Sequence, residues 1–401
     1  MNKSTFFSGQ PVFTQLVKFL PIRIVQKATS DNNADHYCKK FDTYHHLITM
    51  LYACYQHCTS LREVSTGMRA CEGRLQSLGI KYHPARSTFS EANSRRSYKV
   101  FEDIYKGLYA RYSTFFPDSR IKDDRDLVII DSTSISLFKE ILQGTGSRFK
   151  NGKKKGGIKV HMAIKAHEDA AFFVDMTKGS QADVSFLKKV KVPPKSIVLI
   201  DRAYNNYKKL HEWGSDDIHW VSRRRRDATI EVLSENELTG EQKAAGILRD
   251  QLVLMGSKKS NTVQLKCRLV TYLDAERKEA FEFVTNNIEW DARKVADLYK
   301  RRWQIEILFK RLKQNMPLQY FLGDNENAIK IQIYCTLIAD LLLKMALQAV
   351  KRKWAFSNVS SLVRLHLMNY TDLIAFLENP EKAKAYNPIP ENSDHQLSLY
   401  T

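Results

Sequence analysis

The stretch Tyr299-Lys-Arg-Arg-Trp-Gln-Ile-Glu-Ile-Leu-Phe-Lys-Arg-Leu-Lys313 has the pattern of a helix with one narrow polar stripe. At 3.6 residues per turn, Tyr299, Arg302, Glu306 and Lys313 fall within about 60° of one another. The charged face of a surface helix is usually broad, but this stripe has apolar neighbours on both sides, namely Trp303, Ile307, Ile305, Phe309 and Leu312. One carboxylate among cations and a phenol indicates a site that holds a metal ion and a phosphate.

Two further carboxylates directly follow apolar runs. Leu127-Val-Ile-Ile130 precedes Asp131, and Ser196-Ile-Val-Leu-Ile200 precedes Asp201. Such β-branched runs predict buried strands. Either aspartate alone is more typical of a turn. Together with Glu306, however, they make a set of three carboxylates that can bind two hard divalent cations, which suits in-line phosphoryl displacement.

The bulk composition indicates a globular protein with a polyanionic partner. The 401 residues include 63 Lys+Arg and 44 Asp+Glu, which gives a formal net charge of +19. A merely soluble basic protein is the alternative interpretation of this charge. The polar N-terminus, the uneven spacing of the cysteines and the shortness of the apolar run Ile333 to Leu343 predict an intracellular protein without a membrane span.

The periodicity divides the chain into regions of different secondary structure. Residues 11 to 120 are predicted to be helical, and Ser60 to Cys71 with Ser87 to Ser97 have the layout of a helix-turn-helix. Its second helix would offer DNA the side chains of Arg86, Ser87, Thr88, Asn93, Arg95 and Arg96. An ordinary helix pair with a solvated face explains this layout equally well.

Strands and helices then alternate, as in an α/β domain. Strands are predicted at 127–130, 158–165, 171–176 and 196–200, and helices at 182–190 and 207–213. Short alternating segments between 219 and 288 predict a β-rich block. Helical patterns return at 329–350 and 359–377.

Asp131, Asp201 and Glu306, with the Tyr-x2-Arg-x3-Glu-x6-Lys spacing around the glutamate, resemble the bacterial DDE transposases of the insertion sequence 4 family. Three further segments are similar to family sequence: Gly157-Ile-Lys-Val-His161, Asp201-Arg-Ala-Tyr204 and Gly323-Asp-Asn-Glu-Asn-Ala328. The resemblance covers roughly residues 10 to 350. The chain departs from the family pattern where Arg-Ala-Tyr follows the second aspartate, since glycine often precedes that tyrosine in the family.

The resemblance implies an α/β fold: a ribonuclease-H-like mixed five-stranded sheet with flanking helices, interrupted by a β-rich insertion. The 104 residues between Asp201 and Glu306 leave room for that insertion. The expected organisation is a helical N-terminal DNA-binding domain (1–122), the first part of the catalytic core (123–226), the β-rich insertion (227–288), the core helix with the helices after it (289–350) and a helical C-terminal region and tail (351–401).

The implied activity is cut-and-paste DNA transposition. In such enzymes the three acids hold two Mg²⁺ or Mn²⁺ ions, and water attacks at the transposon end. The freed 3′-OH forms a hairpin with the opposite strand, and the reopened end is joined to target DNA. The implied partners are double-stranded DNA (transposon inverted repeats and target) and a second copy in a homodimeric synaptic complex, and the implied location is the bacterial cytoplasm, at the nucleoid.

The resemblance also assigns roles by position. Asp131, Asp201 and Glu306 would be catalytic metal ligands, and Tyr299, Arg302 and Lys313 would hold phosphates of the DNA end. Further possible DNA contacts are Lys153, Lys154, Lys155, Lys159, His161, Arg202, Arg223 and Arg224. For the glycine-flanked lysine loop and the arginine run, solvated surface is the competing interpretation.

Two other functions remain open at this point. A ribonuclease-H-like nuclease would cleave DNA without strand transfer. A DNA-binding repressor with a decayed catalytic domain would bind DNA without cleaving it, although all the acids and all four residues of the motif are present.

Overall fold

The computed structural model describes residues 9–81, 83–115, 125–136, 157–256, 263–316, 318 and 320–382. The chain forms two compact units. The helical unit comprises Met1–Tyr105, Asn315–Gly323 and Ile331–Thr401, and the sheet unit comprises Lys106–Gln314 and Asp324–Lys330. In the part of the chain that the structure describes, no helix is long and apolar enough to cross a membrane.

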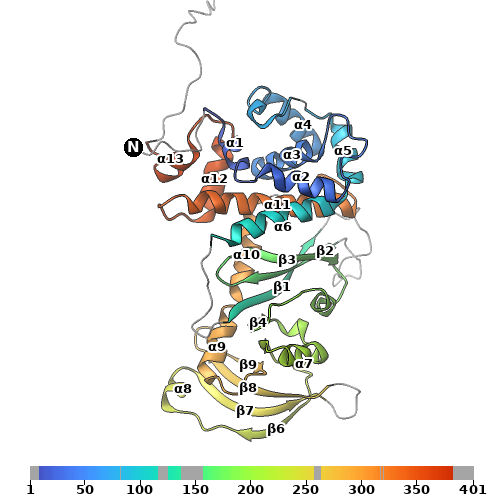
Figure 1. The fold of residues 1–401 in the computed structure, drawn as a ribbon. Coiled ribbons are helices and arrows are strands. Elements are labelled where there is room, and N and C mark those ends of the chain that lie inside the picture. Colours follow the sequence, from blue (N-terminus) through green and yellow to red (C-terminus); the bar gives the residue numbers. More distant parts are fainter. Residues whose placement is uncertain are drawn as a thin grey trace, which may run out of the picture. The chain divides into compact units, whose positions relative to one another are not determined.

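The helical unit combines both ends of the chain, drawn blue and red in Figure 1. The buried helix α3 (Thr43–Gln56) packs on α11 (Glu326–Gln348), since the Tyr55 hydroxyl donates to the carbonyl of Ala339 at 3.0 Å. The other elements are α1 (Val12–Val17), α2 (Ile22–Asp31), α4 (Leu61–Ala70), η1 (Gln76–Leu78), α5 (Arg86–Arg95), the first half of α6 (Tyr98–Ser113), α12 (Phe356–His366) and α13 (Leu373–Glu378). Asp42, Ser60 and Asp372 cap the helices α3, α4 and α13 by accepting backbone N–H groups.

The predicted helix pair exists as α4 and α5, but two of the residues expected to face DNA are buried. Asn93 and Arg96 are 1% and 7% exposed. Arg96 donates to the ring of His46 at 3.0 Å and to the carbonyl of Phe41 at 2.8 Å. The prediction was wrong for these two because both belong to a polar network inside the unit. Arg86, Ser87 and Arg95 are exposed.

His46 makes the stability of this network depend on pH. Burial and the neighbouring Arg96 lower its pKa from 6.5 to about 3, so the folded state keeps the ring neutral. The stabilisation is complete above the unfolded pKa and is lost as pH falls from about 6.5 towards 3. We expect wild type to lose about 2 kcal/mol more unfolding free energy than His46→Gln between pH 7 and pH 5. Urea unfolding at both pH values tests this, and equal losses would contradict it.

The sheet unit is built on one mixed nine-stranded sheet with the order β3-β2-β1-β4-β5-β9-β8-β7-β6 (Figure 1). Its strands are β1 (Asp126–Ser136), β2 (Gly157–Lys165), β3 (Ala171–Lys178), β4 (Ser196–Ile200), β5 (His219–Arg223), β6 (Ile230–Glu235), β7 (Ile247–Met255), β8 (Leu265–Asp274) and β9 (Glu279–Thr285). Among the described strands, only the β1–β4 and β4–β5 pairings are parallel.

The predicted strands of this unit are confirmed, but the β-rich block is part of the same sheet and does not form a separate one. Its last strand, β9, pairs antiparallel with β5, so the block continues the sheet beyond the first five strands. The segment predicted as a helix at 182–190 is the 3-10 helix η2 (Asp183–Lys188). The helices α7 (Tyr207–Ser215) and α8 (Gly240–Ala244) complete the connections.

Large aromatic side chains form part of the core of the sheet unit. Trp213, Trp220 and Phe186 are buried in one cluster with aliphatic residues of β1, β4 and the insertion strands. The indole N–H of Trp220 donates to the carbonyl of Leu210 at 3.1 Å. Trp220 is fully buried and therefore fixes α7 on the sheet.

The stretch predicted as one helix from Tyr299 to Lys313 is two helices. Helix α9 (Ala292–Lys300) ends where Arg301 and Arg302 form a turn, and α10 (Trp303–Asn315) follows. The backbone N–H of Arg302 bonds to the carbonyl of Tyr299, three residues back, at 3.0 Å. This tightened turn moves Tyr299 and Glu306 off a single stripe. One expected apolar border is also absent, because Trp303 and Ile307 are 44% and 60% exposed.

Candidate active site

The two aspartates lie next to each other because their strands are parallel neighbours in register. Ile130 of β1 pairs with Ile200 of β4, and each is followed by its aspartate. Asp201 ends β4 and caps the 3-10 helix η3 (Arg202–Tyr204), where it accepts the N–H of Ala203 at 3.3 Å. Asp131 lies within β1, which continues to Ser136 alongside β2 and is therefore not a strand end as predicted.

The side chain of Asp131 is largely enclosed by the protein. Its side chain is 15% exposed. Its Oδ1 accepts the backbone N–H of Ser132 at 2.8 Å, and its Oδ2 accepts from Arg302 at 2.7 Å. Burial raises the pKa of Asp131 to about 6, although the Arg302 guanidinium opposes the rise. A carboxylate that is costly to keep charged in this way is stabilised by any additional cation.

Glu306 also lies at this site, although it comes from the C-terminal part of the sheet unit. It lies in the first turn of α10, where a negative charge suits the helix dipole. Its Oε1 accepts from Nη2 of Arg302 at 2.6 Å, while Nη1 of the same guanidinium binds Asp131. Arg302 thus joins the two carboxylates, a contact that the expected phosphate-binding role does not include.

Tyr299 and Lys313 border this cluster on either side. The ring of Tyr299 is buried against Phe283 of β9 at a centroid distance of 4.6 Å, and burial raises the pKa of its phenol to about 12. The Arg302 guanidinium lies 5.5 Å from the centre of that ring. Lys313 donates to the carbonyl of Ser134 on β1 at 3.0 Å. All four residues of the motif are therefore near Asp131, although they do not share one helix.

The remaining predicted DNA contacts fall into separate groups. Lys153, Lys154 and Lys155 lie outside the described residues. Arg202 is exposed beside Asp201. Arg223 and Arg224 pair with Glu279 and Glu282 of β9 at 3.5 and 3.0 Å.

His161 and Lys159 belong to a polar network under the site. His161 is fully buried between the hydroxyls of Tyr204 and Thr177, at 3.1 and 2.8 Å, and is shut off from DNA for that reason. Lys159 pairs with Asp183 at 3.1 Å.

Asp183 is a residue whose place at the site the sequence did not reveal. It lies in the first turn of η2. In the structure its Oδ1 accepts the hydroxyl of Ser132 at 2.9 Å, directly next to Asp131. Nothing in the local pattern predicts this contact, because Asp183 lies 51 residues from Ser132 in the sequence.

The three acids offer the hard oxygen donors that Mg²⁺ and Mn²⁺ prefer. In the described part of the chain, no three acidic, histidine or cysteine side chains already stand in a metal-binding arrangement. The single positive charge of Arg302 lies between Asp131 and Glu306 instead. The three carboxylates fit a divalent cation once the guanidinium of Arg302 has moved away from them.

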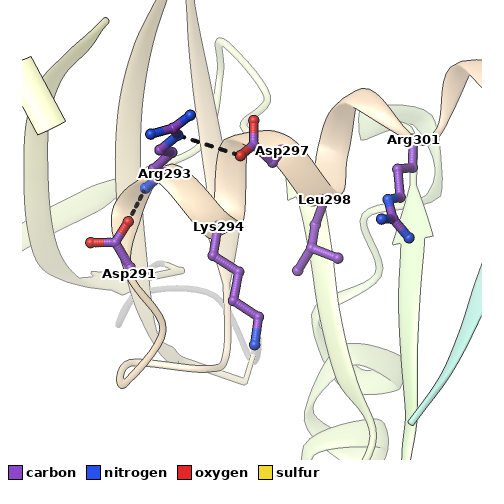
Figure 2. A pocket seen from close by; sticks show the side chains of 6 residues that line it. All are labelled: Asp291, Arg293, Lys294, Asp297, Leu298 and Arg301. Atoms are coloured by element: carbon purple, nitrogen blue, oxygen red, sulfur yellow. Dashed lines mark hydrogen bonds and ion pairs between the residues drawn. The ribbon is translucent and has the colours of Figure 1, made fainter. Parts of the chain in front are cut away.

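The helix that leads into the site also borders a pocket of about 340 Å³ (Figure 2). Figure 2 shows Arg293 and Asp297 on one side of α9, and Lys294 and Leu298 on another. Arg293 pairs with Asp297 at 3.7 Å. Neither Asp131, Asp201 nor Glu306 lines this pocket, so it is a separate surface feature.

Comparisons with known proteins find transposases among the relatives of this chain. A putative transposase y4zB of Sinorhizobium fredii is 27% identical over 79% of this chain and 86% of its own length. A putative transposase for insertion sequence element IS4SA of Synechocystis is 28% identical over 71% of this chain and 78% of its own length. The match to a chain of the piggyBac transposase synaptic complex with hairpin DNA covers 97% of this chain and 88% of that chain. Its identity is 11% and its TM-score 0.43, too distant to carry an argument.

Two family profiles match separate regions. A domain of unknown function, DUF4372, matches residues 8–81. The family described as the transposase DDE domain matches residues 122–342, which is more than half of the chain and includes Asp131, Asp201 and Glu306. The chain therefore belongs to the transposases with a DDE domain.

Proposed function

We propose that this protein is a cut-and-paste transposase of the insertion sequence 4 family that cleaves transposon ends and joins them to target DNA. The observation that supports this best is the convergence of Asp131 and Glu306 on one guanidinium, with Asp201 on the neighbouring parallel strand. The Tyr299, Arg302, Glu306 and Lys313 spacing is the family feature on which the finer assignment rests.

The proposed catalytic core is a ribonuclease-H-like sheet made of the first five strands. Their order, β3-β2-β1-β4-β5, has antiparallel pairs on the β1–β3 side and parallel pairs between β1, β4 and β5. The strands β6 to β9 would be the insertion. The helical unit is proposed to bind the inverted repeats through the exposed side of α5.

Asp131, Asp201 and Glu306 would hold two Mg²⁺ or Mn²⁺ ions. When bound, these ions would supply an activated water or 3′-OH and charge stabilisation for the leaving oxygen. The protein's own contribution is rigid placement: Asp131 is fixed by the Ser132 N–H, and Asp201 by its cap on η3. Fixed ligands keep the reacting groups in line, which a flexible set could not do.

The chain's cations would orient the DNA end. Lys313 lies beside Ser134 on β1, three residues beyond Asp131 and thus roughly 10 Å along the strand. Arg202 flanks Asp201 on the exposed surface. We propose that these cations and the lysine loop 153–155 contact backbone phosphates, and that two copies of the chain bring two ends together.

The test of strand transfer uses a pre-nicked transposon end with a free 3′-OH, taken from the inverted repeats that flank the gene, and a supercoiled target plasmid. With Mg²⁺ we expect joined product from wild type and none from Asp201→Asn. Cleavage of the intact end without joining would establish a nuclease. Binding without either reaction would establish a repressor.

Lys313→Ala should weaken binding of the end duplex in a salt-dependent way. Removing one phosphate contact lowers the slope of log K against log salt by about 1. Fluorescence anisotropy between 50 and 200 mM KCl would measure it. Lys310→Ala, an exposed lysine of the same helix, is the matched control. The same slope for Lys313→Ala and wild type would remove Lys313 from the DNA interface.

A further inference from the structure

The guanidinium of Arg302 occupies the position between Asp131 and Glu306 that a metal ion would need. Its guanidinium donates to Oδ2 of Asp131 at 2.7 Å and to Oε1 of Glu306 at 2.6 Å. The Arg302 side chain is only 10% exposed, so both contacts are largely shielded from water. These are two of the three carboxylates that the proposed function gives to metal ions.

Without a cation, these carboxylates would repel one another. Asp201 and Glu306 both add negative potential at Asp131, after the larger effect of burial. A single guanidinium offsets only part of that charge, because it brings one positive charge to a site with three carboxylates. Divalent ions would compensate it more completely.

The position of Arg302 also allows it to leave. It belongs to the two-residue turn between α9 and α10, so its backbone is not inside a regular helix. Its buried Nε–H has no hydrogen-bond partner among the described residues. The guanidinium therefore lacks one hydrogen bond in this position. Moving to another position costs it fewer hydrogen bonds than a fully bonded guanidinium would lose.

We propose that Arg302 is an internal counter-ion that holds Asp131 and Glu306 together in the metal-free enzyme and competes with incoming metal ions for both carboxylates. This inference rests on the proposed function. Arg302 is in this sense a positioning residue: it keeps the two acids, which come from β1 and α10, at one place until metal replaces it. The displaced guanidinium then becomes available to a DNA phosphate.

The test measures Mn²⁺ binding to the full chain without DNA, by the electron paramagnetic resonance signal of free Mn²⁺. Arg302→Gln is expected to bind Mn²⁺ about tenfold more tightly than wild type, because the competing cation is gone. Arg301→Gln is the matched control, since it removes the same charge from the exposed neighbouring residue. We expect Arg301→Gln to bind Mn²⁺ as wild type does. Equal or weaker binding by Arg302→Gln overturns the proposal.

Thermal unfolding supplies a second readout. In EDTA, Arg302→Gln should melt at a lower temperature than wild type and Arg301→Gln, and Mn²⁺ should raise its melting temperature by more than it raises theirs. If Arg302→Gln does not fold, Arg302→Lys replaces it, because an ammonium is a strongly hydrated point charge that lacks the rigid planar fork by which a guanidinium holds two carboxylates. Arg302→Lys should then bind Mn²⁺ more tightly than wild type, and an unchanged affinity counts against the proposal.

The outcomes separate this inference from the proposed function. A wild-type chain that binds no Mn²⁺ would overturn both. A wild-type chain that binds Mn²⁺ and joins transposon ends, with the same Mn²⁺ affinity in Arg302→Gln, would overturn only the role of Arg302.

Discussion

Glu306→Gln is expected to lower the rate of transposon-end cleavage by about 10²- to 10³-fold, a typical loss for a group that stabilises charge in a transition state. The amide keeps the size of the side chain and an acceptor for Arg302, so the fold and the DNA surface should remain. It removes the negative charge that a metal ligand needs. Chemistry should therefore be lost while binding of the end duplex is retained.

A labelled inverted-repeat duplex, Mg²⁺ and a denaturing gel measure cleavage, and anisotropy measures binding with the same duplex. Glu289→Gln, an exposed acid of the same unit, is the control for loss of charge alone. Cleavage by Glu306→Gln within tenfold of the control would remove Glu306 from the catalytic set.

Asp250→Ala is expected to lower the unfolding free energy by about 3 to 5 kcal/mol, because it leaves a buried guanidinium without its partner. Asp250 of β7 is 2% exposed and accepts from Nε of Arg268 at 2.7 Å. Nη1 of Arg268 donates to the carbonyls of Ile288 and Trp290, just before α9 begins. The pair thus fixes the segment that leads into Tyr299 and Arg302.

Urea unfolding followed by circular dichroism checks this expectation. The double variant Asp250→Leu with Arg268→Met replaces both charges by apolar groups, and it should recover most of the lost stability. A loss below about 1 kcal/mol for Asp250→Ala would show that the pair is not buried in solution, since exposed pairs contribute only that much.

The sequence predicted the strands of the sheet unit because these segments are β-branched apolar runs or alternate between apolar and polar residues. It could not predict that β9 joins β5, since that pairing depends on segments about 60 residues apart. Asp131 and Asp201 could be named from the ends of two apolar runs. Their adjacency required the parallel register of β1 and β4, which only the folded sheet supplies.

Tyr299, Arg302, Glu306 and Lys313 would share one narrow stripe only on a continuous helix. No proline or glycine in that stretch indicates the turn at Arg301 and Arg302. The Tyr-x2-Arg-x3-Glu-x6-Lys spacing was still informative, because it brings its four residues close together whether they lie on one helix or on two. The pairing of Arg302 with two carboxylates could not be predicted, because one of them lies 171 residues away.

The burial of polar residues was also hidden from local patterns. Asn93 and Arg96 look like an exposed polar face of a short helix, yet both satisfy groups inside the helical unit. His161 follows the same principle in the sheet unit, where it bonds Tyr204 and Thr177. In each case the partner is remote in sequence, so periodicity alone could not place the side chain.

The central claim is that Asp131, Asp201 and Glu306 act as one metal-holding set. Calorimetric titration with Mn²⁺ tests it most directly, comparing wild type with Asp131→Asn, Asp201→Asn and Glu306→Gln. We expect wild type to bind Mn²⁺ and each of the three variants to lose at least about tenfold in affinity, the cost of about 1.4 kcal/mol per lost ligand charge. A variant that binds Mn²⁺ as tightly as wild type would contradict the account.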